Sequence, residues 1–211
     1  MAPRSDAETS EQLSAPVKVR IVTAAIAALE LGGEAGIRVD RIAEDASVAK
    51  ASIYSTFGDR DGLIIAAQAE RYREAMRGAI DEYSAAIRQC ATADEFADLI
   101  RSWMIGLTDA DGAERRRVRV EVLGTSTTRP ELQRLLFEVD RQVAREVANL
   151  LLIPHDRGWI DMPFNLEATA QWWYGMLNGR YLIEQQGDAE RLQQWDEVSV
   201  NAMLSLLFAS R

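Results

Sequence analysis

The sequence has one cysteine, one histidine and five prolines among its 211 residues. The single cysteine, Cys90, cannot form an intrachain disulfide, so the cysteine content gives no indication of an oxidising compartment. A zinc site needs several cysteines or histidines at short spacing, and one of each is too few. We therefore expect no metal centre and no cofactor. His155, which lies between a proline and an aspartate, is expected to be a surface residue.

The signatures of several enzyme classes and of membrane spans are also missing. There is no Gly-x-Ser-x-Gly turn to present a nucleophile and no glycine-rich phosphate loop. No apolar run approaches the roughly 18 residues that cross a bilayer. Residues 1–15 are polar and mixed, which predicts a disordered arm and not a secretion signal. We expect a cytoplasmic protein that is not an enzyme and has no membrane segment.

The acidic balance of the chain permits nucleic-acid binding without favouring it. The formal net charge is −9, from 24 basic and 33 acidic residues, and duplex DNA is itself a dense polyanion. Residues 17–65 carry six basic and seven acidic side chains, so the acidic excess lies mainly elsewhere. A nearly neutral segment can still present a cationic face.

Helical periodicity runs through most of the chain, and alternating strand patterns are almost absent, which predicts an all-α fold of about nine helices. Three short helices are expected within residues 16–57, with Gly58 ending the third and Asp59 capping a fourth. In the second of these, apolar residues follow the spacing of a buried stripe, at Val39, Ile42, Ala43 and Ala46. Longer helices are expected at residues 60–87, from a cap at Asp94, and at 113–125, 131–152, 166–186 and 189–209, with a loop at 154–165.

Residues 37–63 have the pattern of a helix-turn-helix, in which the second helix enters the major groove of DNA. In that helix Ile53 and Phe57 are four residues apart and are expected to pack against the first helix. The remaining positions offer a cation, hydroxyls and an aromatic ring, which suit contacts with phosphates and base edges. The residues predicted to bind DNA are Arg41, Lys50, Ala51, Ser52, Tyr54, Ser55, Thr56 and Arg60.

This segment resembles the DNA-binding domain of TetR-family repressors. The residues that carry the resemblance are Ile42, Ala43, Ala46, Val48, Ile53, Tyr54, Phe57 and Leu63, with Arg60 where the family usually has lysine. The resemblance implies that Lys50, Ser52, Tyr54 and Thr56 face operator DNA and that Arg60 holds a phosphate.

Three residues depart from the family pattern. Ser47 replaces a turn glycine at a position expected to be left-handed. Ala49 replaces a capping serine or threonine, and Arg38 replaces a capping threonine. Each departure is expected to cost on the order of 1 kcal/mol of local stability.

The resemblance also implies a domain organisation and a dimer. We expect the arm at residues 1–15, a DNA-binding domain at 16–62 and a helical domain at 63–211 that binds an effector and dimerises. The last two helices are expected to pair with those of a second subunit in a four-helix bundle. The interface residues predicted from close helix approach are Trp172, Gly175, Met176 and Gly179. The alternative is that the two glycines only loosen their helix, at about 1 kcal/mol each.

Large apolar residues of the second half predict a cavity for a largely apolar or aromatic small molecule. They are Trp103, Met104, Leu107, Phe137, Trp173, Tyr174 and Leu177, each of which is also a candidate core residue. Arg119 and Glu121 are candidates for orienting the ligand, or for an internal ion pair or a solvated surface. The run Arg115–Arg116–Arg117 is expected to be a solvated helix face.

The sequence as a whole predicts a dimeric regulator, most simply a repressor, that binds a pseudo-palindromic operator and is released by a small molecule. The principal alternative is a small-molecule-binding or interaction protein of the same fold that binds no operator, and an all-α enzyme is more distant. Steep salt dependence of DNA binding would distinguish the first reading from the others.

Overall fold

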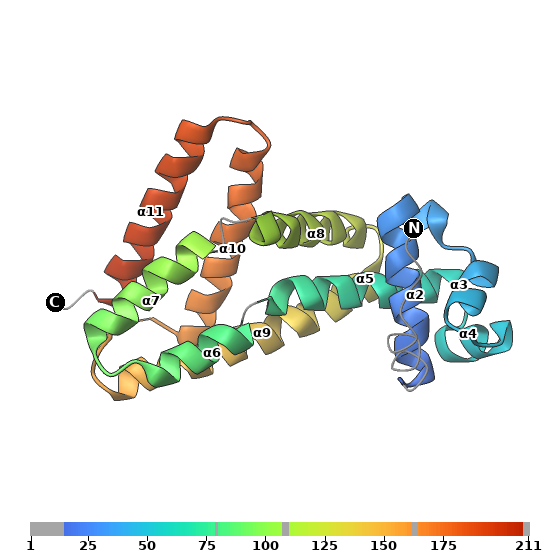
Figure 1. The fold of residues 1–211 in the computed structure, drawn as a ribbon, viewed down its shortest axis with the longest axis horizontal. Helices are drawn as coiled ribbons and strands as arrows, with labels where there is room; N and C mark the ends of the chain where they lie inside the picture. Colours follow the sequence, from blue (N-terminus) through green and yellow to red (C-terminus); the bar gives the residue numbers. More distant parts are fainter. Residues whose placement is uncertain (1–14, 79, 107–109, 162–163, 209–211) are drawn as a thin grey trace, which may run out of the picture. The chain divides into compact units, whose positions relative to one another are not determined.

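The computed structural model describes residues 15–78, 80–106, 110–161 and 164–208. In these ranges it contains ten α-helices, one 3-10 helix and no strand (Figure 1). The all-α prediction is confirmed. None of the described helices combines the length and the apolar character that crossing a bilayer requires.

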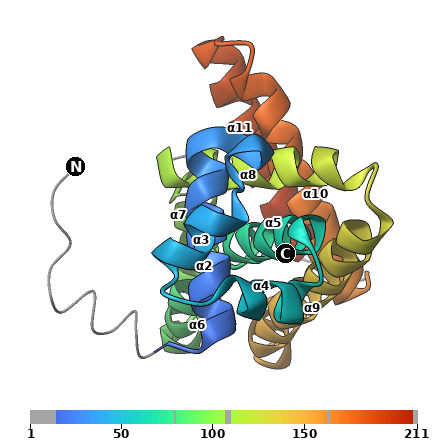
Figure 2. The ribbon, with the colours of Figure 1, turned by 90° about the vertical axis from the view of Figure 1, so that its right-hand side faces the viewer.

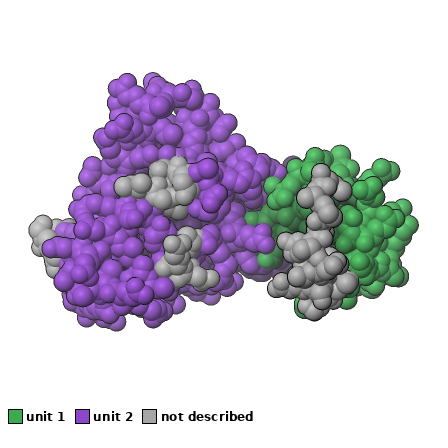
Figure 3. Space-filling view, in the orientation of Figure 1, with its two compact units in different colours: residues 1–71, 130–132 green, residues 72–129, 133–211 purple. Residues whose placement is uncertain are grey.

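The chain divides into two compact units (Figure 3). Unit 1 comprises residues 1–71 and 130–132, and unit 2 comprises residues 72–129 and 133–211. The helices that lie wholly within unit 1 are α2 (Val17–Gly32), the 3-10 helix η1 (Gly33–Gly36), α3 (Val39–Asp45) and α4 (Lys50–Phe57). Helix α5 (Arg60–Arg77) begins in unit 1 and ends in unit 2.

Helices α2, α3 and α4 and the start of α5 belong to unit 1 (Figure 2), and each contributes to one apolar cluster. Ile21, Ile42, Ile53 and Leu63, one from each helix, are all 0% exposed. The predicted stripe of the second helix is confirmed, since Ile42, Ala43 and Ala46 are buried and Val39 packs against the cluster. This core holds the short helices α3 and α4, which would be marginal alone.

Unit 2 contains the end of α5 and six further helices: α6 (Ile80–Gln89), α7 (Ala93–Gly106), α8 (Ala110–Ser126), α9 (Pro130–Asp156), α10 (Leu166–Glu184) and α11 (Ala189–Leu207). Helix α10 packs against both α8 and α11, and α7 packs against α6 and α11. A buried charge network joins three of these helices, because Glu184 pairs with Arg116 and Arg180, and Arg180 also binds Asp196 at 2.6 Å.

Three predicted helix limits in this unit are wrong. The helix expected at 60–87 ends at Arg77, because Gly78 adopts a φ of 42°, a left-handed conformation that stops the helix. Thr92, not Asp94, caps α7, since its hydroxyl accepts the Glu95 backbone N–H at 3.2 Å.

The third concerns α9, which continues through Pro154 to Asp156, although a loop was expected from residue 154. Proline lacks an N–H and usually disrupts a helix interior. In the last turn the loss is small, because Arg157 N still donates to Ile153 O at 3.3 Å and Trp159 N to Pro154 O at 2.9 Å. His155 is exposed as expected, but on the last turn of a helix.

Candidate functional site

The turn between α3 and α4 gives unit 1 the helix-turn-helix that the sequence predicts. Ser47 has a φ of 52° and is the only described residue other than glycine with a positive φ. The turn is closed by two backbone bonds, from Ser47 N to Glu44 O at 3.0 Å and from Val48 N to Ala43 O at 2.9 Å. The prediction of a left-handed serine at this position is confirmed.

Helix α4 separates its residues into a buried and an exposed side. Ile53 is fully buried and Phe57 packs against the core of unit 1, while Tyr54 is 50% exposed. The other predicted DNA contacts of this helix are also accessible: Lys50, Ala51, Ser55 and Thr56 are exposed and Ser52 is half-buried. Arg41 on α3 is exposed as well. The structure therefore gathers these predicted residues on the solvent side of the motif.

Lys50, the one cation of this helix, is already paired. Its Nζ lies 2.7 Å from Oδ1 of Asp40 on α3, and both side chains are mostly exposed. The hydrogen bond and the charge of Asp40 raise the pKa of Lys50. A phosphate must therefore displace Asp40, or share the ammonium with it, to reach Lys50.

Two of the hydroxyls of α4 bond back to their own helix. Ser55 Oγ donates to Ser52 O at 3.1 Å and Thr56 Oγ1 donates to the same carbonyl at 2.7 Å. Each hydroxyl needs only a side-chain rotation to donate to a phosphate instead.

Arg60 has a structural partner that the sequence did not reveal. Its Nε donates to Ile37 O at 2.8 Å, and a second guanidinium nitrogen donates to Glu34 O. The side chain thus fastens the start of α5 to the segment that precedes α3. A guanidinium has five N–H donors, so the remaining ones are still available to a phosphate.

The helix ends follow the departures noted in the sequence. Neither Arg38 at the start of α3 nor Ala49 at the start of α4 provides a side-chain cap. Asp59 does cap α5, as predicted, since its Oδ1 accepts the Gly62 N–H at 2.8 Å. Gly58 ends α4 with a φ of 79°, also as predicted.

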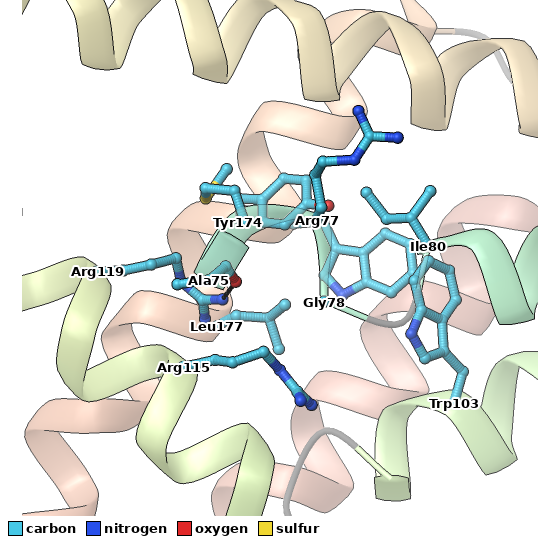
Figure 4. A pocket seen from close by; sticks show the side chains of 11 residues that line it. Ala75, Arg77, Gly78, Ile80, Trp103, Arg115, Arg119, Tyr174 and Leu177 are labelled. Carbon is cyan, nitrogen blue, oxygen red and sulfur yellow. Dashed lines mark hydrogen bonds between the residues drawn. The ribbon is translucent and has the colours of Figure 1, made fainter. Parts of the chain in front are cut away.

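Unit 2 contains a small cavity of about 30 Å³ beside the end of α5 (Figure 4). Four of the residues predicted to bind an effector line it: Trp103, Trp173, Tyr174 and Leu177. The two tryptophans meet edge to face, with their ring centroids 4.1 Å apart. Met104 is buried in the core, and Leu107 lies outside the described residues.

A wider groove of about 580 Å³ shares Met76 and Tyr174 with the small cavity. Phe137, the remaining predicted effector residue, lines this groove and is 56% exposed. The groove also contains Tyr72, whose hydroxyl donates to Asp140 Oδ1 at 2.7 Å. Sequence reasoning missed this pair, because the two residues are 68 positions apart and no local pattern links them.

The arginine run of α8 is not a solvated face. Arg116 is 1% exposed and pairs with Glu184, and Arg115 lines the small cavity. Only Arg117 is exposed, where it binds Glu114 and Glu121. Consecutive helical residues point about 100° apart, so three in a row cannot share one side. Glu121 is therefore a surface partner of Arg117, whereas Arg119 is 4% exposed and lines the cavity.

The residues predicted for the dimer interface lie on α10 in different surroundings. Trp172 is 46% exposed, Gly175 is exposed and Met176 is half-buried. A Cβ at Gly179 would lie 3.4 Å from the Trp195 ring of α11, whereas one at Gly175 would meet nothing within 4 Å. Gly179 thus permits a close approach within the chain itself, and Gly175 leaves its side of the helix open.

The described residues contain no group of three or more histidines, cysteines or carboxylates that could hold a metal ion. Residues 21–67 match the family model of bacterial regulatory proteins, tetR family. This range covers most of α2, all of η1, α3 and α4, and the start of α5. No curated protein matches the sequence.

Several solved structures share the fold. A proposed TetR-family transcriptional regulator of Mesorhizobium loti is 19% identical, with 90% of this chain and 96% of that chain covered and a TM-score of 0.65. A TetR-family regulator of Pectobacterium atrosepticum is 19% identical, with 97% and 98% covered and a TM-score of 0.57. The regulator FadR of Bacillus subtilis, in complex with stearoyl-CoA, is 19% identical, with 90% and 99% covered and a TM-score of 0.52.

Proposed function

The chain carries a TetR-family DNA-binding domain within the fold of TetR-family transcriptional regulators, and from this premise we propose that it represses transcription by binding a pseudo-palindromic operator as a dimer. The observation that carries the proposal is the exposed side of α4, with Tyr54 50% exposed beside Lys50 and three hydroxyl residues. An α-helix with these groups fits the major groove, where base edges differ in donors and acceptors.

The second part of the proposal concerns dimerisation. Large apolar side chains of α10 and α11 are exposed in the single chain: Trp172 is 46%, Leu182 64% and Val198 69% exposed. Exposed apolar surface of this kind indicates a protein interface. A dimer formed through these helices would carry two copies of α4, one for each of two half-sites about one turn of DNA apart.

The third part concerns the effector. The cavity and groove of unit 2 are lined by aromatic and aliphatic side chains with a few polar groups, which is the usual lining of a small-molecule site. Helix α5 carries Leu63 in the core of unit 1 and Met76 and Arg77 in the cavity wall. We propose that a ligand acts on DNA binding through this helix, by binding one of two states more tightly than the other.

The experiment that tests operator binding is a titration of the purified chain with DNA from upstream of its own gene, at low and moderate salt. We expect saturable binding that resists nonspecific competitor and weakens steeply with salt, because phosphate contacts release counterions. Tyr54→Ala and Lys50→Ala should each weaken binding by at least about tenfold without loss of helical content. Arg134→Ala removes an exposed cation from α9 and is the matched control.

One further function remains in view, a ligand-binding protein of this fold that binds no operator. The pairing of Lys50 with Asp40 and the net charge of −9 favour it. If the upstream DNA does not bind, selection from random sequence decides between the two functions. A specific palindrome recovered by the selection supports a regulator with a distant operator, and recovery of none supports the ligand-binding protein.

A further inference from the structure

The small cavity of unit 2 has a polar side that an apolar effector would leave unsatisfied. The indole N–H of Trp173 is buried, with the residue 3% exposed, and no described residue accepts a hydrogen bond from it. A buried donor without an acceptor costs free energy. Because Trp173 lines the cavity, a ligand that brings an acceptor would recover this cost.

Arg119 provides a buried cation in the wall of the same cavity. It projects from α8 into the cavity wall and is 4% exposed (Figure 4). Its Nε donates to Asn178 Oδ1 at 2.8 Å and Nη1 donates to Ala75 O at 3.0 Å. Both acceptors are neutral, and no carboxylate among the described residues forms an ion pair with it. Burial lowers the pKa of Arg119 to about 10, so it remains charged at neutral pH.

The other cations of the wall increase the positive charge. Arg115 also projects from α8 toward Gly78 (Figure 4), and a Cβ at Gly78 would lie 3.2 Å from Arg115 Nε. The guanidinium of Arg77 points away, toward α9, where it binds Glu146 at 3.3 Å.

The neighbouring carboxylates are already engaged. Glu184 pairs with Arg116 and Arg180, and Asp140 accepts the Tyr72 hydroxyl. Among the described residues, no carboxylate forms an ion pair with Arg119 or Arg115, and Asp140 is only near enough for the charge of Arg119 to lower its pKa.

The size of the cavity indicates how large that anion is. About 30 Å³ is available, and one water molecule needs roughly 10–15 Å³ by the same measure. The space thus fits about two oxygen atoms, as in a carboxylate. Met76 and Tyr174 line both this cavity and the groove of about 580 Å³, which is large enough for the body of a small molecule.

We propose that this cavity is the head-group subsite for an organic carboxylate, whose oxygens accept hydrogen bonds from Trp173 Nε1 and the Arg119 guanidinium. The apolar body of the ligand extends past Met76 and Tyr174 into the groove, where it contacts Phe137. This assignment rests on the proposed effector role of unit 2 and specifies its ligand class. Charge-assisted bonds to a buried guanidinium make the negative charge decisive for affinity.

The test compares three probes of one shape and different charge: phenylacetate, phenylacetamide and phenethylammonium. Binding to the full-length chain is measured by calorimetry without DNA, with benzoate and hexanoate as further carboxylates. We expect phenylacetate to bind at least about tenfold more tightly than the amide, and the ammonium to bind more weakly still. Equal binding of acid and amide, preference for the ammonium, or no binding of any carboxylate at millimolar concentration overturns the proposal.

Two variants locate the head group. Trp173→Phe removes the N–H and keeps an aromatic ring, and Arg119→Lys keeps the charge but loses the planar donors. Both should weaken phenylacetate binding by about tenfold and phenylacetamide binding by less, because the amide oxygen accepts only neutral hydrogen bonds. If Arg119→Lys fails to fold, Trp173→Phe alone decides. Arg117→Gln removes an exposed cation from the same helix, and an equal loss of affinity in this control would contradict the assignment.

Because these measurements need no DNA, they separate the two proposals. If the chain binds carboxylates but no operator, only the proposal of a transcriptional regulator is refuted. If it binds its operator but no carboxylate, only the proposal of a carboxylate subsite is refuted.

Discussion

Lys50 Nζ lies 2.7 Å from Asp40 Oδ1, across the turn that joins α3 to α4. This pair places a carboxylate beside the one cation of the helix proposed to enter the DNA groove. The negative charge opposes the approach of a phosphate, and the ion pair must open or be shared when DNA binds. Removing Asp40 therefore measures how much the ion pair weakens DNA binding, separately from what Lys50 itself contributes to DNA binding.

We expect Asp40→Asn to tighten operator binding several-fold, because it frees Lys50 and removes a repulsive charge. Fluorescence anisotropy at several salt concentrations measures the effect. Asp45→Asn, which removes an exposed charge from the same helix, is the control and should have a smaller effect. Weaker binding of Asp40→Asn would show that the carboxylate orients Lys50 for its phosphate.

Replacing Ser47 with glycine should stabilise the folded chain, because Ser47 is in a left-handed conformation. A residue with a side chain costs about 1–2 kcal/mol in the left-handed conformation, and part of this gain is lost because glycine makes the unfolded chain more flexible. We expect Ser47→Gly to raise the free energy of unfolding by about 0.5–1 kcal/mol, measured by urea denaturation. Ser55→Gly, in the interior of α4, should lower it by about 0.5 kcal/mol. The same sign for both variants would refute the conformational argument.

Arg60 is expected to stabilise unit 1 independently of DNA. Arg60→Lys keeps the charge but cannot reach the carbonyls of Ile37 and Glu34 with the same fork of donors. We predict a loss of about 1 kcal/mol in the free energy of unfolding without DNA. Arg41→Lys on the exposed side of α3 should leave stability unchanged. If Arg60→Lys unfolds like the parent chain and only binds DNA less well, its role is phosphate binding alone.

The raised pKa of Asp140 leads us to expect that the stability of the chain depends on pH. Burial raises its pKa, against the hydrogen bond from Tyr72 and the charge of Arg119, which both lower it. Because the folded-state pKa lies above the unfolded value, the stability that this group contributes is full below the unfolded value and is lost as the pH rises through the folded value. Asp140→Asn removes the charge and keeps an acceptor for Tyr72.

We therefore expect Asp140→Asn to melt at a higher temperature than the parent at pH 7. The difference should shrink as the pH falls toward the ordinary aspartate value of 3.8. Thermal melts across this range measure it, with Asp98→Asn, which removes an exposed carboxylate, as the control variant. A difference that widens in acid would mean that burial is not the dominant influence on Asp140.

The sequence by itself determined the helix-turn-helix and the all-α class. Ile42, Ala43 and Ala46 on one helix and Ile53 and Phe57 on the next follow the helical repeat, which depends only on residues three or four apart. The left-handed turn at Ser47 and the cap at Asp59 also depend only on residues that are close together in the sequence. Short-range patterns of this kind can be recognised without a structure, and the family resemblance rests on the same short segment.

Only the tertiary structure decided which polar groups meet. Arg119 and Asn178 are 59 positions apart, and Arg60 and Ile37 are 23 apart, so no spacing rule joins them. The run Arg115–Arg117 could not be assigned from its composition, because packing against α10 decides which side of α8 is buried. Burial makes the Trp173 indole N–H costly to leave without an acceptor and the Arg119 charge costly to leave without a counter-charge. That cost depends on contacts between distant segments, and it points to the carboxylate subsite.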